Sequence, residues 1–237
     1  MLTVIPSAAY GRLGAVLSAL IVCACVIGLT MHRDFYAGVR RKDFFCFYTN
    51  LSNLLVLIYF SLAAPRLYAR AAIRPLIPHA EFLIMMSIML TFCVFHTMIF
   101  PAVFAAARHA ERTREFFILL IDNLIVHYLV PLLVFAYWLL CSPAKQALGA
   151  GDAFLWTMIP ALYLAYIFLS AKRRGVIEET GSPYPYPFLD VGALGARRVA
   201  RICAMLYCAC ASAGLLVIAA VRGMIAFFGV GHALILI

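Results

Sequence analysis

Long apolar runs, separated by short basic or proline-rich stretches, dominate the pattern of this chain. Backbone groups in hydrocarbon must be satisfied within a helix or a closed barrel, and none of the runs alternates as a strand does. The pattern therefore predicts an all-α polytopic membrane protein, one bundle of six transmembrane helices in a single domain. The predicted helices cover residues 13–31, 44–64, 81–106, 116–141, 153–170 and 202–221.

The two ends of the chain are also apolar. The apolar tail, residues 224–237, is too short to span a bilayer alone, so we expect it to prolong the sixth helix or to lie at the interface. Residues 1–10 lack a charged start, and the first apolar run continues as a membrane segment, so no cleavable signal peptide is expected.

The composition and charge agree with a membrane protein. Of 237 residues 66% are hydrophobic and 12% are charged, and the mean hydropathy is +1.00. The net charge of +9 comes from short basic clusters between apolar runs, which is typical of the positive-inside pattern rather than of a nucleic-acid groove. The side facing the loops after the first, third and fifth helices carries most of the Lys and Arg. We therefore expect those loops in the cytoplasm, both termini outside, and no nucleic-acid partner.

The eight cysteines lie in or at the ends of apolar segments, so we interpret them as small apolar packing residues. Cys-x-Cys pairs in a helix point their thiols to different faces. We expect no metal site and no cofactor.

One ionisable side chain lies near the middle of the fourth run. His127 is followed four residues later by Pro131, which removes a backbone N–H and is predicted to kink the helix. Ionisable groups at this depth are costly and mark functional sites by default. Asn123 lies one turn before His127 on the same face. Asp122 is about 140° round the helix, so we expect it to face the cytoplasmic mouth or a basic loop residue.

The second helix opens with a cluster of polar residues. Thr49, Ser52 and Asn53 share a face through their i, i+3, i+4 spacing, and Asn50 lies beside that stripe. Such groups need partners inside the protein. For Asn50 and Ser52, interhelical packing and a role in the site are both open.

The third helix repeats the combination of histidine and proline, with His96 and Pro101. Its neighbours are apolar, so a packing role and a site role are both open for His96.

The loop after the fifth helix interleaves Pro183, Pro185 and Pro187 with tyrosines. It is expected to be stiff, extended and interfacial. In the predicted topology this loop lies on the same side as the starts of the second and fourth helices. The residues expected to converge there are Thr49, Asn53, Asn123, His127 and Asp190.

At these three patches the chain resembles the androgen-induced, FAR-17a-like family of six-helix membrane proteins and its bacterial relatives. The matching residues are Phe47-Tyr48-Thr49-Asn50, Asn123 to His127 with Pro131-Leu132, and Tyr186 to Asp190 with Gly192 and Gly195-Ala196-Arg197. Eukaryotic members of the family are threonine hydrolases of fatty acid esters of hydroxy fatty acids. The resemblance implies an integral protein of a bacterial inner membrane whose partner is a membrane lipid or fatty acid ester.

The resemblance also implies roles for particular residues. Thr49 corresponds to the nucleophile and His127 to the base that accepts its proton. With this assignment, the side-chain amide of Asn50 or Asn53 would serve the oxyanion, and Asp190 or Asn123 would orient the imidazole. The residues expected to bind substrate are Tyr186, Phe188, His96 and Arg197, with Arg197 or Arg198 holding a carboxylate.

Two other functions fit parts of the sequence. His96 and His127 on neighbouring helices are candidate axial ligands of a haem, which would make the protein an electron carrier. Asp122, His127 and Asn53 are candidates for a proton or solute path. Neither an inverted repeat nor paired broken helices accompany them.

Overall fold

The computed structural model describes residues 7–32, 43–63, 77–107, 113–142, 145–177 and 180–228, and these are almost entirely helical. The first half contains α1 (Ser7–His32), η2 (Phe44–Cys46), α2 (Tyr48–Ile58), η3 (Tyr59–Ala63), α4 (Ile77–Val94), η5 (Phe95–Ile99) and α5 (Phe100–Ala107). The second half contains α6 (Arg114–Leu124), η6 (Ile125–Leu129), α7 (Val130–Cys141), η7 (Lys145–Ala147), α8 (Ala150–Leu155), α9 (Met158–Arg174), η8 (Pro187–Leu189), α10 (Val191–Leu194) and α11 (Ala196–Phe228). The all-α prediction is confirmed for this part of the chain.

Five helical stretches of the described residues are long and apolar enough to cross a membrane. They cover Arg12–His32, Pro78–Ile99, Phe116–Cys141, Ala150–Arg174 and Ala196–Phe227. The segment predicted at residues 44–64 differs from the others. It starts with a separate 3-10 turn, bends at Phe47, and is continuous helix only from Tyr48 to Ala63. The last helix begins six residues earlier than predicted and absorbs Arg197, Arg198 and the start of the apolar tail.

Two of the long helices contain a π-helical turn just before a proline. η5 lies between α4 and α5 and precedes Pro101, and η6 lies between α6 and α7 and precedes Pro131. Proline has no N–H and its ring collides with the carbonyl four residues earlier, so a wider turn relieves both problems. The kink predicted at Pro131 therefore takes the form of a π-turn.

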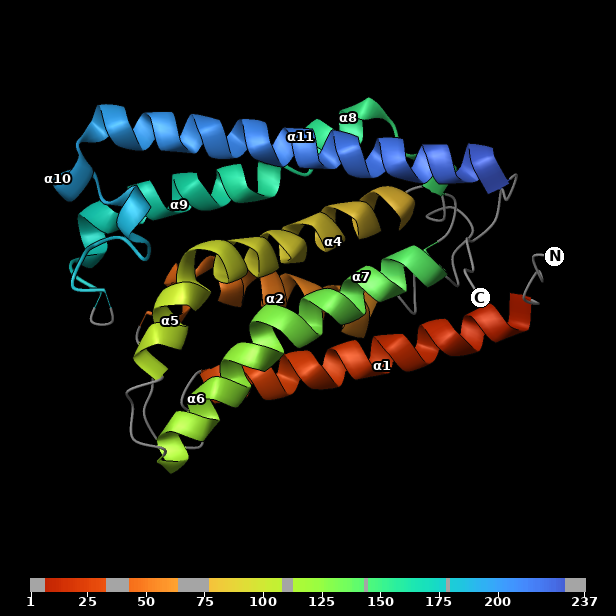
Figure 1. The fold of residues 1–237 in the computed structure, drawn as a ribbon, viewed down its shortest axis with the longest axis horizontal. Coiled ribbons are helices and arrows are strands. Elements are labelled where there is room, and N and C mark those ends of the chain that lie inside the picture. The colour runs from red at the N-terminus through yellow and green to blue at the C-terminus, as the bar shows by residue number, and fades with distance from the viewer. Residues whose placement is uncertain are drawn as a thin grey trace.

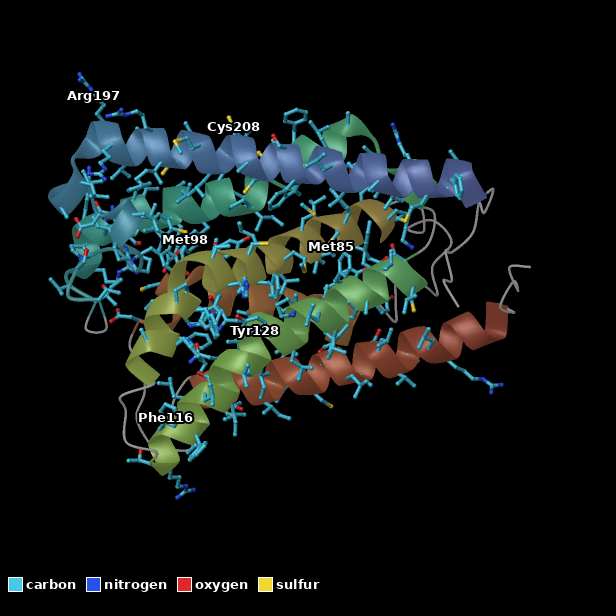
Figure 2. All side chains as sticks on the ribbon, viewed as in Figure 1. Met85, Met98, Phe116, Tyr128, Arg197 and Cys208 are labelled. Carbon is cyan, nitrogen blue, oxygen red and sulfur yellow. The ribbon has the colours of Figure 1, made fainter. Side chains whose placement is uncertain are left out.

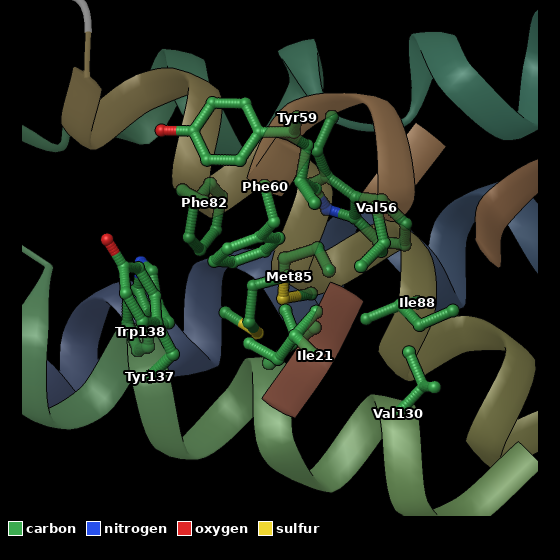
Figure 3. Packing of buried hydrophobic residues seen from close by; sticks show 14 of the residues in the cluster. Ile21, Val56, Tyr59, Phe60, Phe82, Met85, Ile88, Val130, Tyr137 and Trp138 are labelled. Carbon is green, nitrogen blue, oxygen red and sulfur yellow. The ribbon is translucent and has the colours of Figure 1, made fainter. Parts of the chain in front are cut away.

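The helices form one bundle in two parts (Figure 1). α1, α2, α4 and α7 pack against one another, and α11 lies along α8 on the far side of α4. The core between them is apolar and aromatic: Ile21, Phe82, Met85, Ile88 and Trp138 are all 2% exposed or less (Figure 3). Burial of each such side chain contributes on the order of 2 kcal/mol when its alternative is water.

A second, smaller cluster lies at the end of the bundle that holds the polar residues of α2. It consists of Tyr48, Tyr163, Ile167 and Leu189, with the rings of Tyr48 and Tyr163 in edge contact at 5.1 Å between centroids. The cluster joins α2, α9 and the loop before α10. This packing brings the loop that contains Pro183, Pro185 and Pro187 to the start of α2.

Candidate active site

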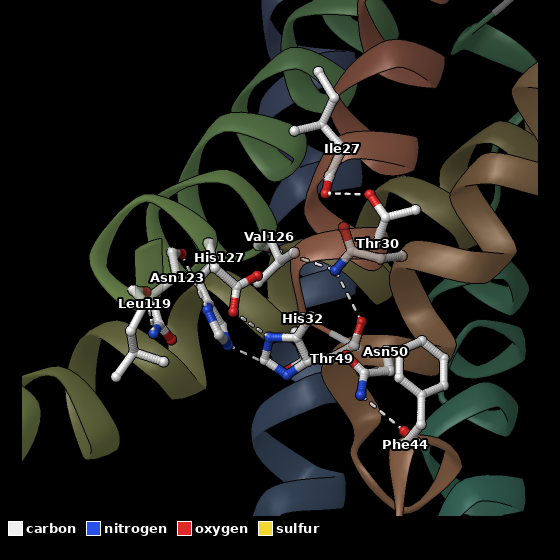
Figure 4. Close-up of polar contacts among 12 residues, drawn as sticks. Ile27, Thr30, His32, Phe44, Thr49, Asn50, Leu119, Asn123, Val126 and His127 are labelled. Atoms are coloured by element: carbon white, nitrogen blue, oxygen red, sulfur yellow. Dashed lines mark hydrogen bonds and ion pairs between the residues drawn. The ribbon is translucent and has the colours of Figure 1, made fainter. Parts of the chain in front are cut away.

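A hydroxyl and an imidazole meet inside the bundle. Thr49 lies in the first turn of α2 and His127 in η6, and Thr49 Oγ1 is 3.2 Å from His127 Nε2 (Figure 4). Both side chains are buried, at 8% and 5% exposure. The two residues are 78 positions apart in sequence and meet because η6 packs against both α1 and α2.

The second nitrogen of His127 fixes the tautomer of the ring. Nδ1 lies 3.1 Å from the carbonyl oxygen of Asn123, which can only accept, so Nδ1 carries the proton. Nε2 of the neutral ring then has a free lone pair, and the Thr49 hydroxyl donates to it. The ring of Phe95 stacks on the imidazole, with 3.8 Å between centroids and 19° between planes. The imidazole is therefore held as a hydrogen-bond acceptor aimed at Thr49.

Asn123 orients the imidazole through its backbone and not through its side chain. Its side-chain amide donates instead to the carbonyl of Leu119, on its own helix. Asp190, the other residue expected in this role, accepts hydrogen bonds from the Ser182 hydroxyl and from the N–H of Ala193. These bonds lower the pKa of Asp190 below its usual value. The expectation that Asp190 converges on His127 is therefore wrong; it organises its own loop.

Asn53 locks α2 against η6. Its side-chain amide donates to the carbonyl of Thr49 at 2.8 Å and to the carbonyl of Val126 at 3.2 Å. The carbonyl of Val126 needs this donor because it has no backbone partner in the π-turn. The N–H of Val130 donates to the carbonyl of Ile125, and the next residue, Pro131, has no N–H to donate to Val126. One asparagine thus ties the backbones of the residues at and beside Thr49 and His127.

The two asparagines predicted as oxyanion donors are engaged elsewhere. Asn53 uses both amide hydrogens as described, and Asn50 donates to the carbonyl of Phe44 at 2.8 Å, closing the turn before α2. Other hydrogen-bond donors face the site, and they belong to the start of α2 and to Tyr186. The N–H of Tyr48 donates to the Tyr186 hydroxyl at 3.1 Å, and that hydroxyl also lies beside the backbone and side chain of Thr49.

Tyr186 keeps its proton in this setting. Burial raises the pKa of its phenol above the usual value, although the neighbouring N–H of Tyr48 and the Thr49 hydroxyl oppose that effect. The phenol is consequently a hydrogen-bond donor at neutral pH. The Phe188 ring stacks on Tyr186 at 5.3 Å between centroids, which holds the tyrosine over the start of α2.

An apolar pocket of about 100 Å³ lies in front of Thr49. Its wall comes from α2, α4, η5, α9, α11 and the loop before α10. Tyr186 and Phe188, two of the residues predicted to bind substrate, are part of this wall. Tyr207 and Ala161 line it while being exposed, so the pocket opens between helices toward the outside of the bundle. His127 does not line the pocket; it lies behind Thr49.

Two other predicted contacts with substrate are outside the pocket. His96 is exposed on η5, where its Nδ1 lies 3.0 Å from the Tyr128 hydroxyl. Arg197 lies in the first turn of α11 and points away from the bundle (Figure 2). The structure therefore brings neither side chain to Thr49.

A histidine that the sequence did not single out joins the site. His32, the last residue of α1, places Nδ1 2.6 Å from Oδ2 of Asp122. Asp122 does turn away from His127, as its angle round the helix indicated, but its partner ends a spanning helix rather than lying in a loop. The sequence signal was present: His32 ends an apolar run at the same predicted membrane side as Asp122.

Comparisons with known proteins add no relative. No family model, no curated protein and no solved structure matches the chain.

Proposed function

We propose that the protein is an intramembrane threonine hydrolase that cleaves fatty acyl esters. The observation that carries this proposal is the buried Thr49–His127 hydrogen bond, with the imidazole tautomer set by the Asn123 carbonyl. A threonine hydroxyl is a weak nucleophile and becomes effective when a positioned base removes its proton. The resemblance to androgen-induced, FAR-17a-like proteins points to the same two residues.

The reaction follows from these contacts. Thr49 Oγ1 attacks the ester carbonyl while its proton passes to His127 Nε2. The tetrahedral intermediate then collapses, the C–O bond to the alcohol breaks, and His127 returns the proton to the departing oxygen. Water, deprotonated by His127, next cleaves the acyl-threonine and releases the fatty acid.

The developing negative charge has donors at the start of α2. The first N–H groups of a helix have no partner within it, and the N-terminus carries partial positive charge. The N–H of Thr49 and the phenol of Tyr186 are the groups beside the reacting hydroxyl. They take the oxyanion role that the sequence had given to Asn50 or Asn53. Removing one such donor typically lowers the rate by about 100- to 1,000-fold.

A six-span arrangement suits this activity, and we propose that α2 with η3 is the sixth span beside the five long helices of the described residues. In support, α1 begins and α11 ends at the same end of the bundle, as in a chain with an even number of crossings (Figure 1). The 16 residues of α2 and η3 rise about 24 Å, short of a hydrocarbon core of about 30 Å. Substrate would enter sideways from the bilayer into the apolar pocket, with the termini outside and the site near the cytoplasmic face.

The competing haem function requires larger changes. His127 uses both ring nitrogens, and His96 is exposed and hydrogen-bonded to Tyr128. Both rings would have to give up these bonds to bind one iron, so no observation favours this alternative.

The test is covalent labelling of purified protein in detergent with a long-chain fluorophosphonate, with the labelled residue identified by mass spectrometry. We expect labelling at Thr49, its loss in Thr49→Ala and His127→Ala, and its return in Thr49→Ser. Thr157→Ala is the matched control, because Thr157 also lines the pocket but its hydroxyl, among the described residues, donates to the carbonyl of Phe154 and not to a histidine. Labelling that persists in folded Thr49→Ala protein, or that is absent from the wild type, would refute the proposal.

A further inference from the structure

A buried carboxylate lies on the side of His127 away from the pocket. Asp122 is 2% exposed; its Oδ2 accepts the 2.6 Å hydrogen bond from His32, while its Oδ1 is buried without a partner in the described structure. Removing a carboxylate from water costs several kcal/mol unless its lone pairs are satisfied. Half of this carboxylate is unsatisfied, so packing stability alone is a poor explanation for it.

The pair is close to the proposed base. α1 packs against both α6 and η6, and the ring of His32 lies beside the ring of His127 (Figure 4). No residue of α1 or α6 lines the pocket. His127 thus has Thr49 and the pocket on one side, and the Asp122–His32 pair on the other.

His127 needs a negative charge that its own contacts do not provide. When it takes the proton of Thr49 it becomes a buried imidazolium, and the partner of its Nδ1 is a neutral carbonyl. In the Ser-His-Asp arrangement a carboxylate fills that position and stabilises the imidazolium. Here the candidate carboxylate is Asp122, which lies on the same kinked helix as His127 and is hydrogen-bonded to His32.

We propose that Asp122 and His32 form a positioning pair whose net charge stabilises the imidazolium of His127. The proposal rests on the hydrolase function above. With His32 neutral the pair carries one negative charge and favours proton transfer to His127; with His32 protonated the pair is neutral and the support is lost. The rate of attack by Thr49 therefore depends on the charge of Asp122.

Within the described residues, few other ionisable groups adjoin this pair. Of the other elements with the most contacts to α1, which are α2, η3 and α7, none contains Asp, Glu, His, Lys or Arg. η6 contributes His127, and α6 contributes Asp122, with Arg114 and Glu115 two turns earlier on the same helix.

The experiment measures the rate of fluorophosphonate labelling of Thr49 against pH. In this step the Oγ–P bond forms, the P–F bond breaks, fluoride leaves, and the Thr49 proton goes to His127, so the rate reports on the base directly. Asp122→Asn should lower the high-pH plateau by about 10- to 100-fold, as expected for loss of one charge several ångströms away at an effective dielectric constant of about 20. His32→Gln keeps a hydrogen-bond donor for Asp122 and leaves the carboxylate in place, so the loss of rate should be smaller than in Asp122→Asn.

The protein contains a matched control pair. His79 Nδ1 lies 2.7 Å from Oδ1 of Asp152, and Asp152 is also buried, but these residues belong to α4 and α8, outside the site. Asp152→Asn should leave the labelling rate and its pH profile unchanged. The proposal is wrong if Asp122→Asn behaves like Asp152→Asn, or if His32→Gln lowers the plateau as Asp122→Asn does, which would indicate a structural role.

A second measurement separates this inference from the hydrolase function. Nitrogen-15 histidine NMR in detergent, with His127 assigned by its loss in His127→Ala, follows the protonation of the imidazole without substrate. Asp122→Asn should change the titration of His127, and Asp152→Asn should not. If wild-type Thr49 is never labelled but the titration still moves, the hydrolase function fails while the charge coupling stands; an unmoved titration overturns the coupling.

Discussion

The two π-turns, η5 and η6, both arise from a proline that follows them, but the histidine is buried in η6 and exposed in η5. In η6, Val126 and His127 are buried, and the carbonyl that faces Pro131 is satisfied by Asn53 from α2. In η5, the carbonyl of His96 likewise faces Pro101, five residues later, which has no N–H to donate. The His96 side chain is exposed, however, and Phe95 is the one side chain of η5 that is buried. A histidine before a proline in a membrane helix is thus not a site by itself. It becomes one when a neighbouring helix supplies both the donor for the freed carbonyl and the reacting partner.

The largest effect should come from Pro131→Ala compared with Pro101→Ala. Alanine restores an N–H at position 131, so Val126 gains a backbone partner, η6 can tighten to an α-helix, and His127 rotates away from Thr49. We expect fluorophosphonate labelling to fall on the order of 100-fold, since a shift of about 1 Å at a reacting group has that effect. Pro101→Ala should cost less than tenfold. Equal losses would show that the two turns do not differ in function.

Asn53→Ala tests the cross-helix lock directly. It leaves the carbonyl of Val126 buried without a donor, which costs about 1–3 kcal/mol of stability, and it frees η6 to shift relative to Thr49. We expect labelling to fall about 10-fold or more, together with a lower unfolding temperature in detergent. Ser52 lies on the same helix as Asn53, and Ser52→Ala removes its 2.7 Å bond to Thr91 of α4. This variant should lower stability without a comparable loss of labelling.

Gly28→Ala should disturb η6 from the other side. A Cβ at Gly28 would lie 2.7 Å from Cγ1 of Val126 and 2.8 Å from Cγ2 of Ile125, so α1 or η6 must move. We expect a loss of about 1–3 kcal/mol from overpacking and a several-fold slower labelling of Thr49. Gly14→Ala on the same helix meets only ordinary contacts at 3.7 Å or more and should leave both thermal unfolding and labelling unchanged. A neutral Gly28→Ala would argue against tight packing at η6.

The smallest effect should come from His96→Phe. The ring of His96 lies between those of Phe92 and Phe100, at 5.9 Å from each, and its one side-chain hydrogen bond in the described structure goes to Tyr128. Phenylalanine keeps the stack and loses that bond, so labelling should change by less than threefold, with a stability loss of about 1 kcal/mol. A large loss of activity would give η5 a direct part in the chemistry and revive the binding role predicted for His96.

The sequence alone determined the class of structure. Apolar runs of helical length, basic clusters between them and ionisable groups at depth left few alternatives to a helical membrane protein, because lipid admits few backbone arrangements. It also indicated Thr49, Asn53, Asn123, His127 and Asp190 as neighbours, since their spacing and predicted membrane side agreed. The contact between Thr49 and His127 matches that prediction, whereas Asp190 bonds within its own loop; the catalytic roles remain a proposal.

Tertiary structure alone decided which groups do what around that contact. The sequence could not show that Asn53 uses its amide on a carbonyl freed by Pro131, that Tyr186 reaches the start of α2, or that His32 pairs with Asp122. Each depends on how helices distant in sequence rotate and slide against one another. Local pattern fixes which face of a helix is polar, but the partner of each polar group is set by packing across the bundle.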